Sequence, residues 1–510
     1  MGYVNRQYDS TLDFVTEADL KNVVDPSDKQ RIRAYQLYDD MYHTRPETFS
    51  VTLRGDSDIE IYLPSLKKYV NAVSRFLAVG MDFVIDPDNF QTNEQERKDA
   101  LYQYLQNLFV REKFYQKILQ QKRTMLTKGD AVWHIVADDT KELDRQLSIY
   151  TVDPSHYFPE EDEDGRVIAV MLVDEIPDPD DKTKTVARVQ TYRREYETNE
   201  NGVKVFTGQI LSKLEHYELG GWDYRNLDSD SIKLLRVIRP EEPLPESIKS
   251  IPVYHIPNTP PNGSSWGLSL GAGIEYIMNA LNQSATYEDL TLILNGLGIY
   301  VSTAGPPQDP ESGEPTTYDL SPGSVAEIGE GQDLRRVSGV TTVEPFQSHL
   351  SFLDSAAQQA IGIPDIAVGQ VDVSVVESGV ALALKMGPML ADNADRELEI
   401  LGVMDQMLYD LVNYWLPVYS PIDPSGIIVR FKVDDPMPVN RDSVITEITT
   451  LYTSGLITFD MAAERLSKLG YKFPENALLQ IITEQQAAAG IFPGDETQGA
   501  EEPVTEDEGV

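Results

Sequence analysis

The chain has 510 residues, of which 41% are hydrophobic and 25% charged, and its formal net charge is −40. This length allows two or three domains or one elongated subunit, and the composition is that of a folded protein. The acidity argues against a clamp that grips nucleic acid through basic stripes. It fits either a solubility role or a surface that must not hold DNA. Because the chain has no cysteine, disulfides, thiolate metal sites and cysteine nucleophiles are excluded.

Helical periodicity governs the first part of the chain. It predicts helices over Lys29–Tyr42, Pro64–Phe83 and Asn93–Leu126, and Lys128-Gly129-Asp130 is expected to end the third because glycine suits the position after a helix. No apolar run reaches the roughly 18 residues of a membrane span, and the first ten residues lack the apolar core of a signal peptide.

From Ala131 onward the hydrophobic period changes to two, which predicts an antiparallel β region. The run Glu160–Gly165 resembles the start of a calcium loop, but its twelfth position would be Met171 rather than glutamate, so a turn between strands is expected. Pro-rich linkers are expected at 240–245 and 257–262. The expected strands are Ala131–Ala137, Leu147–Val152, Val167–Asp174, Val186–Tyr196, Val203–Thr207, Lys213–Leu219 and Ile232–Val237.

The second half returns to helical periodicity. Helices are expected over Gly271–Leu297, Val343–Ile361 and Gly379–Leu416, and Pro388 should kink the last because it lacks a backbone donor. An acidic insertion rich in Gly, Pro and Ser separates the first two. The chain is then expected to form a strand at Gly426–Lys432, helices at Asp442–Ser454, Phe459–Leu469 and Asn476–Ala489, and a disordered acidic end.

An apolar segment lies between the second and third of these helices. From Ile363 to Val376 it carries Asp365 and Asp372 but no Lys or Arg, and its β-branched residues include Val371, Val373 and Val375. An exposed apolar loop of this kind usually marks a surface that touches a partner.

No enzyme constellation emerges from the motifs. Gly267-Leu268-Ser269-Leu270-Gly271 matches G-x-S-x-G, but a loop precedes it where the nucleophile elbow needs a strand, and only His349 lies downstream. A capping role for Ser269 is the better interpretation. His134, beside Trp133 in a strand, is expected to be a core or interface residue. There is no phosphate loop and no H-E-x-x-H, so neither a cofactor nor a metal is expected.

The order of these elements resembles the portal proteins of tailed double-stranded DNA bacteriophages, of the siphophage type. The residues that carry the resemblance are Gly129-Asp130-Ala131-Val132-Trp133, Tyr150-Thr151-Val152-Asp153-Pro154-Ser155, Gly362-Ile363-Pro364, Glu377-Ser378-Gly379-Val380-Ala381-Leu382 and Gly455-Leu456-Ile457-Thr458. Together they cover most of residues 30–485.

The resemblance implies an α+β fold in an elongated portal subunit. Its expected parts are an N-terminal segment and wing with helices and an antiparallel β region (1–270), a stem helix (271–298), a small clip (299–342), a second stem helix (343–361), a tunnel loop (362–376), a kinked wing helix with a strand (377–439), a helical crown (440–490) and an acidic disordered tail (491–510).

The resemblance also assigns roles to residues. In the tunnel loop, the residues expected to face DNA are Ile363, Pro364, Asp365, Ile366, Val368, Val371, Asp372, Val373 and Val375. Lys385 is a hypothetical phosphate contact, Arg335 and Arg336 are the expected clip surface for the packaging motor or adaptor, and Gly387-Pro388 is the expected kink. The stem packing residues are Ile274, Ile277, Met278, Leu281, Phe346, Leu350 and Leu353. A single copy is not expected to bury these two stem stripes, so neighbouring subunits should complete them.

The implied protein is a homo-oligomeric ring, a dodecamer by resemblance, at a single capsid vertex of the virion, assembled in the host cytoplasm. Its implied partners are double-stranded DNA in the tunnel, the large terminase subunit, the major capsid protein and scaffold, and a head–tail adaptor, with no membrane. Two alternatives stay open: a capsid-associated or tail-adaptor structural protein without a DNA tunnel, and a hydrolase using Ser269.

Overall fold

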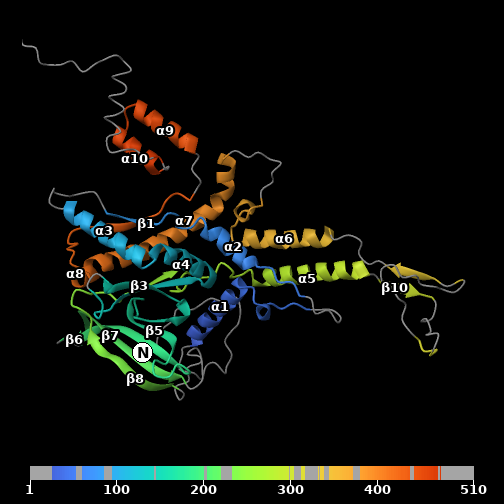
Figure 1. Ribbon diagram of the computed structural model, residues 1–510, viewed down its shortest axis with the longest axis horizontal. Helices are drawn as coiled ribbons and strands as arrows, with labels where there is room; N and C mark the ends of the chain where they lie inside the picture. The colour runs from blue at the N-terminus through green and yellow to red at the C-terminus, as the bar shows by residue number, and fades with distance from the viewer. Residues whose placement is uncertain are drawn as a thin grey trace, which may run out of the picture. The chain divides into compact units, whose positions relative to one another are not determined.

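The computed structural model divides the chain into two compact units, residues 1–436 and 437–510. The described residues are 26–52, 60–85, 95–142, 145–199, 204–219, 232–297, 299–303, 312–315, 331, 333–337, 344–370, 379–436, 441–468 and 471. Within them the fold is α+β, with helices and antiparallel sheets (Figure 1). None of the helices described is long and apolar enough to cross a membrane.

The first helices of the first unit pack against one another and form part of its core. They are α1 (Pro26–Tyr42), α2 (Ser65–Ser74), α3 (Gln95–Arg111) and α4 (Phe114–Lys128), with the short 3₁₀ helix η2 (Pro46–Thr48) after α1. The single helix predicted over Asn93–Leu126 is wrong: Lys113 has a left-handed φ of 52° and separates α3 from α4. The predicted end of α4 is confirmed, because Gly129 is left-handed with φ 102°.

Aromatic side chains join distant parts of the chain in this core. The rings of Phe109 on α3 and Phe114 on α4 stack with their centroids 4.2 Å apart. The centroid of the Phe114 ring also lies 5.7 Å from that of Phe431 and 5.3 Å from that of Trp133. Because Phe431 comes from a strand more than 300 positions later in the sequence, the C-terminal part of this unit completes a core that the N-terminal helices begin.

Two small antiparallel sheets lie beside these helices. The three-stranded sheet has the order β3–β2–β9, and the two-stranded sheet pairs β1 with β12. The sequence predicted β2, β3 and β12 but missed β1 and β9. Their bounds are β1 (Asp82–Ile85), β2 (Asp130–Ala137), β3 (Leu147–Val152), β9 (Val253–Pro257) and β12 (Val429–Lys432).

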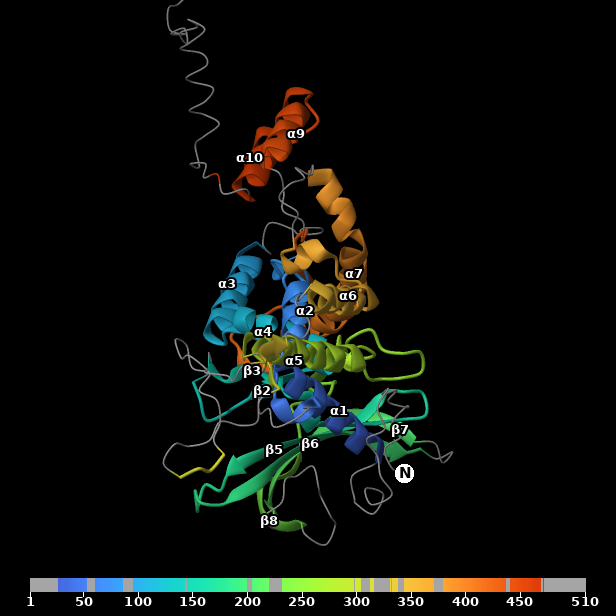
Figure 2. The same ribbon diagram turned by 90° about the vertical axis from the view of Figure 1, so that its right-hand side faces the viewer.

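The larger sheet is a five-stranded antiparallel meander in the order β4–β5–β6–β7–β8. It forms an outer layer of this unit, and β2 and β3 lie between it and α4 (Figures 1 and 2). Its strands are β4 (Tyr157–Glu161), β5 (Val167–Pro177), β6 (Thr185–Thr198), β7 (Lys204–Leu219) and β8 (Ile232–Pro243). The 3₁₀ helix η5 (Pro154–His156) leads into β4.

Several predictions for this region need correction. The two strands predicted at Val203–Thr207 and Lys213–Leu219 are one strand, β7, in which Gly208 at φ 87° lies at a bulge where the pairing with β6 shifts register. The linker predicted at 240–245 lies partly in β8, and β4 was not predicted. The turn predicted at Glu160–Gly165 is confirmed, since it joins β4 to β5 and Gly165 has φ 78°.

The remaining helices of the first unit agree closely with the predicted ones. They are α5 (Glu275–Leu297), α6 (Glu344–Ala360), the 3₁₀ helix η7 (Asp365–Val368), α7 (Gly379–Asp410), the π-helical turn η8 (Leu411–Trp415) and α8 (Leu416–Tyr419). Strands β10 (Ile299–Ser302) and β11 (Leu334–Val337) pair between α5 and α6. The second unit contains α9 (Arg441–Thr453) and α10 (Phe459–Lys468). The predicted helix at Asn476–Ala489 and the acidic end lie outside the described residues.

Candidate functional site

The segment after α6, which the sequence singled out, begins with a helix-ending motif. Gly362 has φ 70° and donates its N–H to the Gln359 carbonyl at 3.3 Å, while the Ile363 N–H reaches the Gln358 carbonyl at 2.9 Å. These two bonds form a Schellman motif, and Pro364 follows it, where it prevents the helix from continuing. The sequence Gly362-Ile363-Pro364 is therefore explained by a sharp stop of α6.

The described part of this segment has one buried side and one exposed side. Ile363 is 3% exposed and Ala367 on η7 is 5% exposed, whereas Asp365 and Gln370 are exposed. The role predicted for Ile363 on a DNA-facing surface is therefore wrong for this single chain, because its side chain packs inward. Pro364, Ile366 and Val368 are half-buried. The predicted residues Val371, Asp372, Val373 and Val375 lie outside the described residues.

A carboxylate on α6 fixes this helix to α2. Asp354 accepts hydrogen bonds from Lys68 Nζ at 2.6 Å, from the Tyr69 hydroxyl at 2.6 Å and from Gln358 Nε2 at 2.8 Å. Burial acts to raise the pKa of the Asp354 carboxyl, but the hydrogen bonds from Lys68 and Tyr69 outweigh it and hold the pKa below its usual value. Asp354 is therefore a charged anchor just before the segment.

Helix α7 is anchored on the other side of the segment. Its Asn393 donates to the Val73 carbonyl at 3.3 Å, and its Glu397 accepts the Ala78 N–H at 2.6 Å. Burial raises the pKa of Glu397. A Cβ at Gly362 would lie 2.8 Å from the Asp392 carboxylate of α7, so the turn and the helix are in close contact. Both helices that flank the segment are thus bonded to α2 or to the residues just after it.

The N-terminal part of α7 carries the other predicted residues. The helix continues through Gly387 and Pro388 to Asp410, and Figure 1 shows it changing direction in its N-terminal part. A bend at Pro388 stays a prediction. Lys385 is exposed, as is Leu384 at 75%. Position and exposure are compatible with a contact by Lys385 and do not test it.

Side-chain amides of α5 bind the backbone of an extended segment that precedes α2. Asn282 accepts the Leu63 N–H at 2.8 Å, and Gln283 accepts the Thr52 N–H at 2.7 Å and donates to the Thr52 carbonyl at 2.9 Å. These bonds replace the pairing that a neighbouring strand would give. Nothing in the hydrophobic pattern pointed to this contact.

The burial of three stem residues corrects one expectation about the helix pair. Ile274, Met278 and Leu281 on α5 are only 1–2% exposed within one chain, so they need no neighbouring subunit for burial. The other predicted packing residues are half-buried, namely Ile277, Phe346, Leu350 and Leu353.

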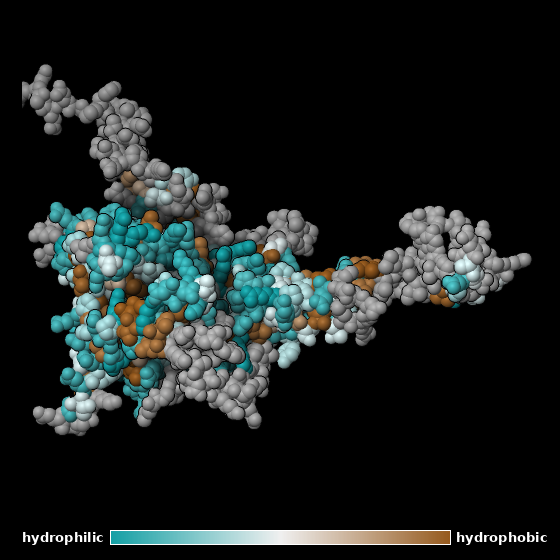
Figure 3. All heavy atoms as spheres, turned by 60° about the horizontal axis from the view of Figure 1, so that its bottom comes forward, coloured by the Kyte–Doolittle hydropathy of each residue, from teal (hydrophilic) through white to brown (hydrophobic). Residues whose placement is uncertain are grey.

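Other apolar side chains of the helix pair are left uncovered. Helices α5 and α6 lie side by side (Figure 1). Tyr276 is 70% exposed, Leu292 is 48% exposed and Phe352 is 65% exposed. We call these three residues the apolar stem face, a surface that extends over two sides of the helix pair because Tyr276 and Leu292 lie about 160° apart around α5. Apolar residues are visible on the surface around this helix pair in Figure 3. Such a face is typical of a surface that is covered in an assembly.

The predicted clip is described only in part. Strands β10 and β11 are antiparallel, with Val301 opposite Arg335 and Tyr300 opposite Arg336. The Arg335 side chain is exposed, and that of Arg336 lies outside the described side chains. Most of the predicted clip, 299–342, is likewise outside the described residues.

The G-x-S-x-G motif forms a packed turn. The Ser269 hydroxyl accepts the Gly271 N–H at 3.0 Å within this turn, but the predicted helix-capping role is wrong, because α5 begins only at Glu275. A Cβ at Gly267 would lie 2.1 Å from the Gly129 carbonyl oxygen and 2.2 Å from the Asn258 nitrogen, so glycine is required by close backbone packing. His349 lies on α6, where its ring contacts Phe352. The segment 257–262 is not a linker, because Asn258 is 2% exposed.

Beside this turn lies a buried polar centre that the sequence analysis missed. The Asp130 carboxylate is fully buried and accepts hydrogen bonds from the Tyr35 hydroxyl at 2.5 Å, from His255 Nε2 at 2.7 Å and from the Gly267 N–H at 3.0 Å. We call these four residues the Asp130 centre. They join α1, β2, β9 and the turn before α5. The motif Gly129-Asp130 could have indicated it, since a polar residue stands at the start of an apolar strand.

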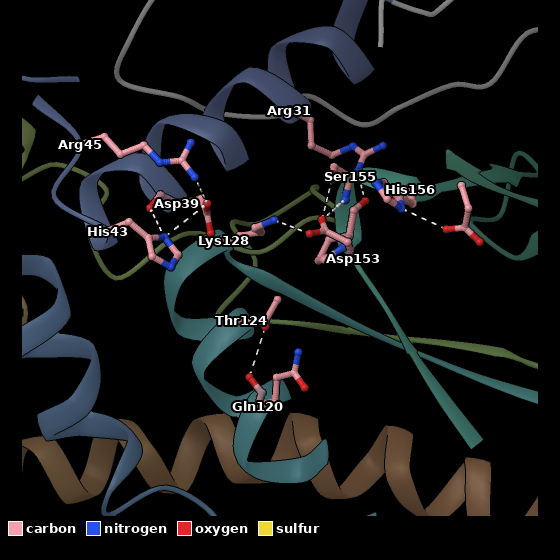
Figure 4. A network of polar contacts seen from close by, with 12 residues as sticks. Arg31, Asp39, His43, Arg45, Gln120, Thr124, Lys128, Asp153, Ser155 and His156 are labelled. Atoms are coloured by element: carbon pink, nitrogen blue, oxygen red, sulfur yellow. Dashed lines mark hydrogen bonds and ion pairs between the residues drawn. The ribbon is translucent and has the colours of Figure 1, made fainter. Parts of the chain in front are cut away.

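A second polar cluster joins α4 to η5 (Figure 4). Asp153 accepts Lys128 Nζ at 2.5 Å and the Ser155 N–H at 2.9 Å. Burial would raise the pKa of Asp153, but the Lys128 ammonium and the Ser155 bonds lower it to about 2. The predicted motif Asp153-Pro154-Ser155 is thus a capped turn held by a lysine.

Arg31 of α1 completes the contact with this turn. Its guanidinium is fully buried and donates to the carbonyls of Pro154 at 2.8 Å and Tyr157 at 3.0 Å. It also pairs with Asp28 at 2.8 Å and lies 3.9 Å from the centroid of the Trp266 ring.

A cavity of about 900 Å³ lies between the three-stranded and five-stranded sheets. His134 and Tyr192 on its wall are hydrogen bonded at 2.9 Å. Burial lowers the pKa of His134 to about 3 and raises that of Tyr192 above its usual range, so both side chains stay neutral near pH 7. His134 is therefore a core residue, one of the two roles expected for it. No cluster of metal-binding side chains occurs among the described residues.

Comparison with known proteins adds no assignment. No family model matches the chain, and no curated protein matches its sequence.

Proposed function

We propose that this chain is the subunit of a phage portal ring, through which DNA enters and leaves the capsid at one vertex. Support comes from the order of the elements. Helices α5 and α6 flank the β10–β11 pair, an apolar segment follows α6, and the long helix α7 follows that segment. This order is the one that the sequence resemblance implies.

The apolar stem face is the observation that carries the proposal. Phe352, Tyr276 and Leu292 are 48–70% exposed on two paired helices of a strongly acidic chain. Large apolar side chains on a helix face favour burial against another surface. In a ring, the neighbouring copies cover this face by repeating one heterologous contact until it closes.

The segment after α6 supports a role in passing DNA without holding it. Residues 361–370 contain no Lys or Arg, and Asp365 is exposed. Since phosphate binding depends on Lys and Arg, such a lining gives DNA few anchors. Screening confines the effect of the chain's net charge of −40 to groups within roughly 8–10 Å of the DNA.

The proposed partners follow from the same role. The ring contains this chain alone, holds double-stranded DNA in its channel, and contacts the capsid protein and scaffold at the vertex of the virion. Because the sequence has no phosphate loop, ATP hydrolysis falls to the large terminase subunit, which docks on the surface that includes Arg335. A head–tail adaptor replaces the motor later. In this proposal the chain itself is not an enzyme.

The test is the size and symmetry of the purified protein. Light scattering and negative-stain microscopy should show a large cyclic oligomer with a central channel. A monomer at micromolar concentration would overturn the proposal. A closed ring without a channel would favour the alternative, a structural or adaptor protein that surrounds no DNA.

The DNA contact of Lys385 is tested separately. With Lys385→Glu, rings should form normally, but packaging or genome retention should fall because the exposed cation near the segment is lost. Lys182→Glu, at an exposed position of the turn between β5 and β6, is a control with the same change of charge. If Lys385→Glu packaged and retained DNA like the unchanged protein, this residue would have no such role.

A further inference from the structure

The five-stranded sheet has two edges that differ in how they are covered. Strand β4 forms one edge. The buried Arg31 side chain donates a hydrogen bond to its Tyr157 carbonyl at 3.0 Å. Strand β8 forms the other edge and, among the residues that the structure describes, pairs with β7 alone. Its outer backbone groups are therefore available to a further strand.

The two halves of β8 differ in how well they are protected against the addition of a strand. Its end, Pro240-Glu241-Glu242-Pro243, carries prolines and charges, which are common means of blocking strand addition. Its first half carries exposed apolar side chains. Their exposed fractions are 53% for Leu234, 44% for Leu235, 47% for Val237 and 47% for Ile238.

The pairing with β7 shifts register at Leu235 and Ile238, so the alternation of β8 is interrupted there. As a result, the paired residues Leu234 and Val237 lie on one face of the strand, and Arg236 and Arg239 lie on the other. Apolar atoms gather on the surface over the β7–β8 region in Figure 3. A strand added to the edge would contact the apolar face and the basic face together and use the open backbone groups as well.

The charges indicate which strand fits. The half Ile232–Arg239 contains Lys233, Arg236 and Arg239 and no acidic residue, in a chain of net charge −40. Arg236 is paired with Asp178 at 3.2 Å and with Asp180. Arg239 makes no ion pair with any described residue, so it is available to an acidic group.

In the symmetric register centred on Arg236, a second copy of β8 is unfavourable at this edge. Antiparallel pairing centred on Arg236 would place Arg239 of each copy opposite Lys233 of the other. Like charges directly opposite each other destabilise a strand pair. The complementary strand alternates acidic and apolar residues.

We propose that β8 is a docking edge for an extended segment of another protein, in which acidic residues alternate with apolar ones. The segment adds as a sixth strand beside Leu234–Ile238. This inference does not depend on the portal function, because it uses only the sheet edge and its charges.

The test uses three labelled octapeptides and the full chain. One alternates Glu and Val, one alternates Lys and Val, and one is the acidic peptide with a central proline. Fluorescence anisotropy should show the acidic peptide binding about tenfold more tightly than the other two. Hydrogen exchange should show new protection of the amides of residues 234–238. No binding of the acidic peptide, or protection elsewhere, would overturn the proposal.

Two variants separate charge from apolar contact. Arg239→Glu should reverse the preference, so that the Lys–Val peptide binds more tightly, while Arg145→Glu at a side chain that is 66% exposed should not. Ile238→Lys should abolish binding, whereas Val110→Lys on α3 should leave it unchanged. Equal binding by wild type and Arg239→Glu would overturn the proposal. So would self-association that Ile238→Lys removes, since the occupant would then be a second copy.

Discussion

The Asp130 centre and the apolar stem face lie in the same unit, but they are completed differently. Asp130 is fully buried, and side chains or backbone from three other parts of the same chain satisfy its carboxylate. Phe352 on α6 is 65% exposed, and no described part of the chain covers it in this way. The first region therefore stabilises the fold of one copy, and the second is suited to joining copies. Changes in the first should alter unfolding, and changes in the second should alter assembly.

The largest expected effect on stability comes from Asp130→Ala. It removes the common acceptor of Tyr35, His255 and Gly267 and leaves their buried donors without a partner. We expect a loss of about 3–5 kcal/mol in the free energy of unfolding, measured by chemical denaturation. Asp180→Ala, at a side chain that is 80% exposed, is the control. A loss below about 1 kcal/mol would show that the centre contributes little.

A smaller effect is expected from His134. Burial lowers the pKa of His134 to about 3 in the folded chain, against 6.5 for an exposed histidine, so protonation favours unfolding. Stability from neutral His134 is fully present above pH 6.5 and is lost as the pH falls from 6.5 towards 3. Between pH 7 and 5 the wild type should lose about 2 kcal/mol that His134→Gln does not lose. Parallel pH profiles for the two proteins would contradict this prediction.

Asp354→Asn should lower the free energy of unfolding by about 1–2 kcal/mol, less than Asp130→Ala does. The charge-assisted bonds to Lys68 and Tyr69 are weakened in this variant but not removed. The pKa of Asp354 is lowered in the folded chain, so its contribution is present above the unfolded value of 3.8 and is lost as the pH falls through the folded value. The difference between Asp354→Asn and wild type should therefore shrink in acid. A difference that stays constant down to pH 2 would show that charge is not its source.

The smallest effect on unfolding is expected at the apolar stem face. Phe352→Asp combined with Leu292→Asp should change stability by less than about 0.5 kcal/mol, since both side chains are largely in solvent. The same variant should reduce the particle size measured by light scattering to that of a single chain. Ser351→Asp, at the neighbouring exposed position, should leave assembly intact. A variant that stays assembled would mean that copies meet elsewhere.

The sequence predicted elements that repeat a strong hydrophobic period. Helices α5, α6 and α7 and most strands of the β region were found because their apolar residues recur at a spacing of 3.6 or two. The break at Lys113 was missed, because the apolar stripe runs through it from Phe109 to Phe114 and only the left-handed backbone reveals the end of α3. Strand β9 was missed because prolines on both sides suggested a linker.

The candidate site was predicted less completely than the fold. Gly362-Ile363-Pro364 indicated a turn, and a Schellman motif is present. The periodicity did not show that Ile363 packs inward, since a short apolar segment has no fixed face. The hydrogen bonds of the Asp130 centre join residues up to 137 positions apart, and no local pattern connects them. Whether the segment meets DNA depends on other copies of the chain, which one sequence does not contain.

The long-range bonds of α1 have a consequence for synthesis on the ribosome. The hydroxyl of Tyr38 bonds the carboxylate of Glu275 at 2.7 Å, across 237 positions of the sequence. At translation rates of 5–20 residues per second, roughly 12–50 s pass before that partner is made. During this interval the nascent chain carries a helix α1 that can meet α2 and α4 but still lacks its contact with α5. Chaperones that shelter unfinished chains would act on this protein mainly within that interval.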